Sequence, residues 1–169
     1  MNSKRVFTFL VLFLLAAVVT TTRPSSAVTL DDKRSAFGEG QFSFFNFASP
    51  PFTEHVAFSF SATMNENGKG RGRATFEYLT TQTRVEVKIN CASVSTSAAV
   101  MTGRVQHSDD PDFPKGVNVV FVAIDGSKLP VQFFDRITPI FVLPDELDCN
   151  DGVEPLTILI PSGDIVIEP

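Results

Sequence analysis

The sequence predicts an all-β fold, either a single antiparallel β-sandwich or a closed β-barrel of about eight or nine strands. Apolar and polar residues alternate strictly over residues 54–91, which is typical of strands with one buried and one solvent-facing side. Turn residues recur roughly every 8 to 12 positions. After residue 27, no stretch of ten or more residues has the 3.6-residue period of an amphipathic helix.

The first 27 residues have the three parts of a secretory signal peptide. Lys4 and Arg5 form a basic start, residues 6–19 are an apolar run broken only by Thr8, and the small residues Ser25 and Ala27 suit cleavage after position 27. The apolar run is shorter than the roughly 20 residues that cross a bilayer. We therefore expect a secreted or periplasmic protein with no membrane span after cleavage.

Residues 28–36 are polar without periodicity and are predicted to be a flexible leader to a single domain over residues 37–169. Three of the 14 basic residues precede the cleavage point, so 11 remain against 19 acidic residues, a net charge of −8. A surface of this charge repels nucleic acid and anionic membranes. We expect no nucleic-acid partner, and the sequence leaves the actual partner unknown.

The first half of the domain predicts four strands in order. The first is expected near 37–47, and a meander of three follows at about 54–64, 72–79 and 83–91. Asn67 and Gly68 suit the tight turn inside the meander.

The second half predicts shorter strands. Residues 92–106 continue the β pattern, with Gly103 as a bulge or close-contact position. Residues 117–124 are apolar on both faces, which predicts a central strand. Asp125 and Gly126 begin a turn. The last strands are expected at 131–137, 140–143, 156–160 and 165–167.

Residues 68–73, Gly-Lys-Gly-Arg-Gly-Arg, form the one concentrated basic patch. They lack the interleaved aromatic residues of a nucleic-acid surface and the spacing of a phosphate loop. The patch is therefore interpreted as a flexible, soluble hairpin tip. Glu77 and Glu86 are expected to form cross-strand charge pairs near Arg84 and Lys88.

The aromatic residues are 17 Phe, one Tyr and no Trp. Sugar-binding surfaces usually expose Trp and Tyr, so this composition argues against such a surface. The apolar face of the meander could instead line a barrel that holds an apolar ligand. The candidate ligand-binding residues are Phe58, Phe60, Phe76 and Tyr78.

Asp145, Asp148 and Asp151 offer the hard oxygen ligands that calcium prefers. Their spacing does not match the helix-flanked calcium loop, and a solvated loop tip is the alternative. Calcium is the one cofactor that the sequence suggests.

Cys91 and Cys149 are the only cysteines. In an oxidising compartment they could form a disulfide. Alternatively, Cys91 continues an apolar strand face and is an ordinary buried residue.

No catalytic residue is identified. His107, Ser108 and Asp109 are the residue types of a hydrolase triad, but adjacent residues cannot generally reach one another as a triad must. His55 is the only other imidazole.

A series of short motifs occurs in a fixed order between positions 38 and 135. They are Gly38 and Gly40; 58–62; Gly72, Ala74, Phe76 and Tyr78; Val85, Val87, Ile89, Cys91 and Val94; 99–103; Phe121, Ala123, Asp125 and Gly126; and Phe134 and Asp135. This order resembles a family of small secreted, mostly bacterial β-domains of unknown function, labelled post-COAP. The resemblance implies secretion and a β-fold, and it supplies no catalytic residues. The chain has Ser127 and Lys128 where the family has Glu-Pro.

The sequence thus favours a secreted, non-enzymatic β-domain with a binding or structural role. The alternative is a small β-barrel that binds or acts on an apolar small molecule.

Overall fold

The computed structural model describes residues 33–45, 53–65, 69–131, 133–145, 148–151 and 156–169, which form antiparallel strands, one short 3-10 turn and connecting loops, with no α-helix among them. These residues belong to the compact unit Asp31–Pro169. The all-β class is confirmed. The predicted signal peptide, positions 28–32 of the predicted leader, and the turn at Asn67 and Gly68 lie outside the described residues.

The strands are β1 (Arg34–Phe45), β2 (Thr53–Met64), β3 (Gly70–Tyr78), β4 (Thr83–Val94), β5 (Ala98–Ser108), β6 (Asn118–Ile124), β7 (Arg136–Ile137), β8 (Phe141–Val142), β9 (Ile158–Leu159) and β10 (Ser162–Glu168). The turn η1 (Gly126–Lys128) follows β6. β1 begins at Arg34, ahead of the expected position 37. The strand expected over 131–137 is reduced to β7, because the backbone N–H of Phe133 donates to the carbonyl of Gly126 and not to a neighbouring strand.

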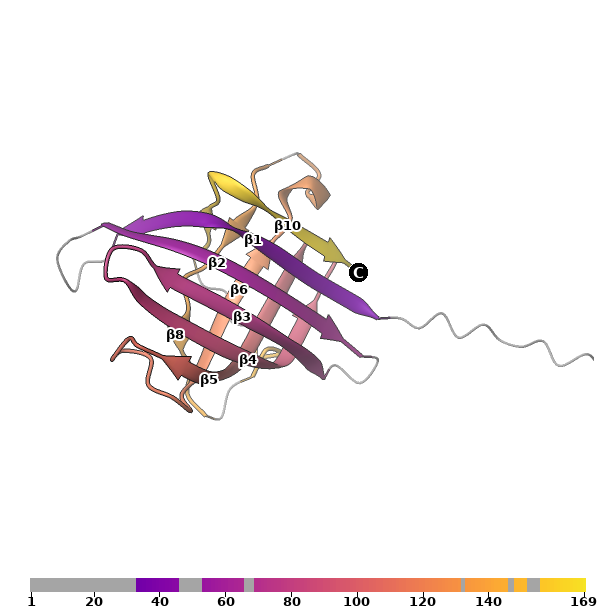
Figure 1. Cartoon of the computed structure of the whole chain (residues 1–169). Helices are drawn as coiled ribbons and strands as arrows, with labels where there is room; N and C mark the ends of the chain where they lie inside the picture. The colour runs from indigo at the N-terminus through magenta and orange to yellow at the C-terminus, as the bar shows by residue number, and fades with distance from the viewer. Residues whose placement is uncertain (1–32, 46–52, 66–68, 132, 146–147, 152–155) are drawn as a thin grey trace, which may run out of the picture. The chain divides into compact units, whose positions relative to one another are not determined.

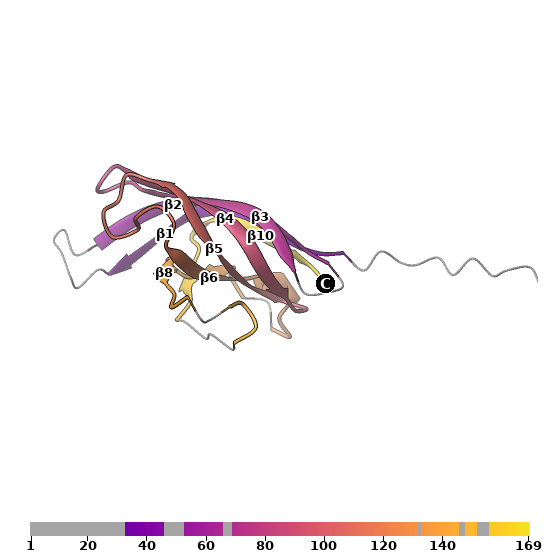
Figure 2. The same cartoon turned by 90° about the horizontal axis from the view of Figure 1, so that it is seen from below.

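The strands form one sheet in the order β10-β1-β2-β3-β4-β5-β6-β7-β9, with β8 paired to β6. The long strands β1 to β5 and β10 make one curved layer, and β6 and β8 lie against its concave side (Figure 1; Figure 2). The sheet does not close on itself, so the closed β-barrel, one of the two predicted architectures, is wrong. A sandwich-like arrangement of an open sheet is what forms.

Side chains, and not another strand, satisfy the second edge of β10. Asp135 Oδ2 accepts a hydrogen bond from the backbone N–H of Ile165 at 2.8 Å, and Asp125 Oδ2 accepts one from that of Ile167 at 3.2 Å. Because these carboxylates take the places of strand carbonyls, β10 needs no second neighbour and the sheet stays open.

The core lies between the concave side of the long strands and β6. Residues 119–123 of β6 are all buried, as the apolar pattern on both faces predicts. Phe121 packs edge-on against Phe60 and Phe76, with ring centroids 5.7 and 5.2 Å apart. The other face of β1 to β5 and β10 points to solvent, and we call it the outer face.

Candidate functional site

Three basic side chains lie side by side on the outer face. Arg73 on β3 is directly opposite Lys88 on β4, and Lys88 is directly opposite Arg104 on β5. Neighbouring strands are about 4.8 Å apart, so three positive charges line up across three adjacent strands. We call these three residues the cationic row. Like charges directly opposite one another in a sheet are destabilising.

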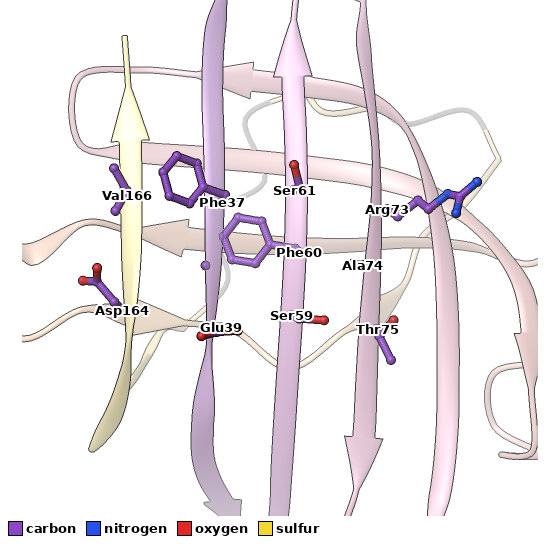
Figure 3. A pocket seen from close by; sticks show the side chains of 11 residues that line it. Phe37, Glu39, Ser59, Phe60, Ser61, Arg73, Ala74, Thr75, Asp164 and Val166 are labelled. Carbon is purple, nitrogen blue, oxygen red and sulfur yellow. The ribbon is translucent and has the colours of Figure 1, made fainter.

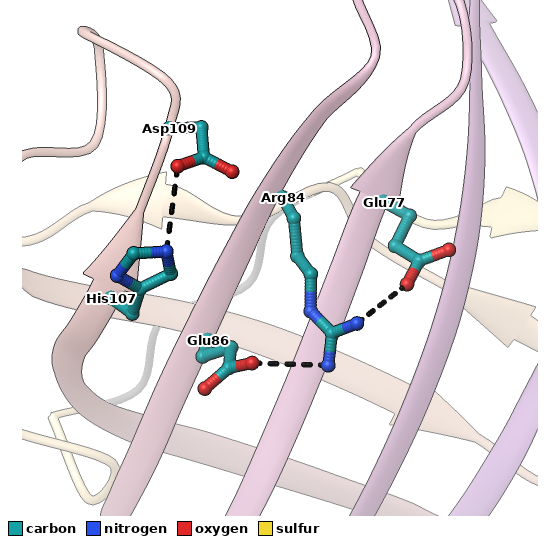
Figure 4. Close-up of polar contacts among 5 residues, drawn as sticks. All are labelled: Glu77, Arg84, Glu86, His107 and Asp109. Atoms are coloured by element: carbon teal, nitrogen blue, oxygen red, sulfur yellow. Dashed lines mark hydrogen bonds and ion pairs between the residues drawn. The ribbon is translucent and has the colours of Figure 1, made fainter.

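No carboxylate in the described part of the chain forms an ion pair with the cationic row. Arg104 Nε donates a hydrogen bond to the side-chain oxygen of Asn118 at 3.0 Å. The two carboxylates of β3 and β4 on the same face pair elsewhere: Arg84 binds Glu77 at 3.1 Å and Glu86 at 3.0 Å (Figure 4). The predicted cross-strand charge pairing is confirmed for Arg84, and Lys88 takes no part in it.

The interpretation of the basic patch as a hairpin tip is wrong for residues 70–73. These residues belong to β3 and pair with β2 on one side, and from Gly72 onward with β4 on the other. Strand pairing places Arg71 and Arg73 on a charged sheet surface, which also includes Lys88 and Arg104. Alternation along the strands could have indicated that Arg73 and Lys88 share a face.

The place of Arg104 in the row could not be predicted, because the register between β4 and β5 shifts at Glu86/Val87 and again at Ile89/Cys91. Gly103 allows the close approach at this irregular pairing. A Cβ atom there would lie 2.4 Å from the carbonyl oxygen of Lys88, so no larger residue fits. The predicted close-contact role of Gly103 is confirmed.

The cationic row lies in a polar trough that crosses the strands. A hollow of about 1300 Å³ over β2 to β5 shares Ser61, Arg73 and Thr75 with a second hollow over β10 to β3. It shares Lys69 and Asn90 with a third hollow that extends to β6. The three hollows therefore adjoin one another across the strands, and we call them together the trough. Figure 3 shows its β10 end, where Phe37, Ser61 and Arg73 project from three neighbouring strands.

The four residues predicted to line an apolar ligand site are buried in the core. Phe58, Phe60, Phe76 and Tyr78 are between 0% and 6% exposed. Phe58 stacks on Phe60 with ring centroids 6.2 Å apart, and Tyr78 stacks on Phe113 at 6.1 Å. Only Phe60 also reaches the lining of the trough. This packing gives no support to an apolar ligand site, which stays a prediction.

Burial raises the pKa of the Tyr78 phenol, and the carboxylates of Asp110, Glu54 and Asp112 raise it further. The phenol is therefore neutral at physiological pH and does not act as a base.

The predicted calcium ligands are engaged by other partners. Asp148 Oδ1 accepts the backbone N–H of Asn150, and Asp151 Oδ2 accepts that of Asp148. Asp145 Oδ1 accepts a hydrogen bond from the Asn118 amide at 2.6 Å. These contacts are those of a solvated loop that caps its own backbone. Calcium binding at Asp145, Asp148 and Asp151 stays a prediction.

Cys91 and Cys149 form a disulfide, with Cα atoms 5.7 Å apart. This settles the choice between a bridge and two separate residues. The bridge ties the 148–151 loop to β4 beside the trough, where Cys91 and Asn150 contribute to the lining.

The serine and histidine residues do not assemble a triad in the described part of the chain. Ser108 Oγ donates to the carbonyl of Asp110, while His107 lies 3.4 Å from Asp109. Ser43 Oγ lies 2.7 Å from His55 Nδ1, but both are exposed, and among the described residues no carboxylate is paired with this imidazole.

Comparison with known proteins gave no match: no family model, no curated protein and no solved structure is similar to this chain. Within the described residues, no helix has the length and apolarity needed to cross a membrane.

Proposed function

We propose that this chain is a secreted, non-enzymatic binding domain that takes an anionic ligand on the outer face of its sheet. The observation that carries the proposal is the cationic row of Arg73, Lys88 and Arg104. Three like charges in register lower the stability of a sheet. An arrangement that breaks a folding rule without a compensating contact is typical of functional sites.

The surroundings of the row favour an anion. Arg71 on β3 and Lys69 just before it add two more positive charges to the same hollow. Glu86, the acidic residue that lines this hollow, forms an ion pair with Arg84, which Glu77 shares, and none with the row. The domain as a whole is acidic, so the row is a local positive region that an anion would find by its field.

Secretion is supported by the signal-like start of the chain and by the disulfide, which persists in oxidising compartments.

Titration calorimetry with inorganic tripolyphosphate tests this function. We expect binding at low salt that weakens steeply as sodium chloride is raised, because exposed charges are screened within about 10 Å at 0.1 M salt. Lys88→Gln should weaken binding about tenfold. Arg84→Gln is the matched control. It also replaces a cation by glutamine on the same strand and face, but at a residue that already forms ion pairs with Glu77 and Glu86. Equal loss in both variants, or in neither, contradicts the proposal.

A further inference from the structure

The trough suits a linear ligand that runs across the strands. One row of residues in register crosses seven strands from β10 to β6: Val166, Phe37, Ser61, Arg73, Lys88, Arg104 and Asn118. At about 4.8 Å per strand, this row is about 30 Å long. A single small anion would contact only one or two of its members.

The spacing of the cationic row sets the spacing of the charges it would neutralise. One positive charge occurs on each strand, about every 4.8 Å, which is close to the length of one sugar ring. A polysaccharide that carries carboxylates along its chain would therefore present anions at intervals of one or a few rings to the cationic row.

The uncharged groups of the trough suit sugar hydroxyls. Ser61, Thr63 and Thr75 line the central hollow on the β2 and β3 side, and Asn90 and Gln106 line it on the β4 and β5 side. Hydroxyl and amide groups both donate and accept hydrogen bonds, as sugar hydroxyls do.

At the β10 end, Phe37 is 42% exposed and lies opposite Val166 and Ser61. Its ring offers an apolar surface for the C–H face of a sugar. With Phe37 as the exposed ring of the trough and no Trp in the chain, recognition would depend mainly on charge and hydrogen bonds.

Nucleic acid fits the trough less well. Proteins that bind single strands stack successive bases on several aromatic rings, whereas Phe37 is the one exposed ring among the residues that line these hollows. Glu39 and Asp164 at one end, and Asp145 at the other, would repel the anionic groups of any ligand, so these groups are expected over β3 to β5.

We infer that the ligand of the outer face is an acidic polysaccharide, bound across the strands with its carboxylates on the cationic row and one ring against Phe37. This inference rests on the proposed anion-binding function and adds the class of the ligand.

The test is titration calorimetry of the purified protein with galacturonate oligomers from dimer to octamer. Tripolyphosphate, methyl-esterified octamer and single-stranded polyuridylate serve as comparison ligands. We expect affinity for galacturonate to rise with length until the trough is filled, and the ester to lose about tenfold or more. Phe37→Ala should weaken octamer binding about fivefold and leave tripolyphosphate binding unchanged. Lys88→Gln should weaken both.

The outcomes separate the two proposals. The polysaccharide inference falls and anion binding stands if tripolyphosphate binding responds to Lys88→Gln and any one of four other results is found. These results are equal binding of the ester and the acid, no effect of oligomer length, no effect of Phe37→Ala on octamer binding, and tighter binding of polyuridylate than of the octamer. If Lys88→Gln changes the binding of neither tripolyphosphate nor the octamer, both proposals fall.

Discussion

Charged side chains occupy two contrasting regions of this domain, the free edge of β10 and the outer face of β3 to β5. At the edge, Asp125 is only 2% exposed and its carboxylate accepts hydrogen bonds from Ser127 N, Ser127 Oγ and Ile167 N. On the outer face, Arg73 and Lys88 are exposed; Lys88 lies between two cations across the strands, and Arg73 lies between Lys88 and the uncharged Ser61.

This difference separates charged side chains that stabilise the fold from charged side chains that do not. A buried carboxylate is tolerated when hydrogen bonds satisfy it, and its donors then depend on it. An exposed row of like charges contributes no stabilising interaction to the fold and lowers its stability slightly. The fold therefore explains Asp125 and Asp135, while the cationic row has to be explained by what it binds.

The largest expected effect is at the edge of β10. Asp125→Ala removes the acceptor of the Ile167 and Ser127 N–H groups, and that of Ile167 is then buried without this partner. We expect a loss of about 2 to 4 kcal/mol in the free energy of unfolding, measured by urea denaturation. A loss below about 0.5 kcal/mol would show that this edge does not depend on the carboxylate.

A smaller loss is expected for the paired cation of the outer face. Arg84→Gln breaks the exposed ion pairs with Glu77 and Glu86 and should lower the free energy of unfolding by about 0.5 to 1 kcal/mol at low salt. The difference from wild type should shrink in 1 M sodium chloride, because salt screens exposed pairs. A difference that does not depend on salt would assign the effect to packing of the arginine stem.

The smallest effect should have the opposite sign. Lys88→Gln removes a positive charge that lies between Arg73 and Arg104. We expect the free energy of unfolding to rise by a few tenths of a kcal/mol at low salt, measured on the same urea curves. A fall comparable to that of Arg84→Gln would mean that Lys88 has a stabilising partner and that the contrast between the two cations is wrong.

The sequence predicted the regular part of this molecule well and the irregular part poorly. Strict alternation placed β2, β3 and β4 to within a few residues, because each has one dry and one wet side. The open edge was missed, because alternation says nothing about a side chain such as that of Asp135 acting as the neighbour of a strand. The residues 70–73 were misassigned, because glycine and charge in a short run suit a turn as well as a strand.

The candidate site depends on register more than on residue type. Arg73 stood out in the sequence, but Lys88 and Arg104 lie on two other strands, and the register shift at Ile89/Cys91, between the β4–β5 turn and this pair, decides that they meet. A bulge moves every later side chain relative to its neighbours. The charges were therefore visible in the sequence, and their alignment was not.

The double variant Arg73→Gln/Lys88→Gln, measured both for urea unfolding and for binding of tripolyphosphate at low salt, tests the central claim most directly. The account predicts a stability equal to or above that of wild type, together with loss of most of the binding. A variant that is less stable and binds tripolyphosphate as tightly as wild type would contradict it, because the row would then serve the fold and not a ligand.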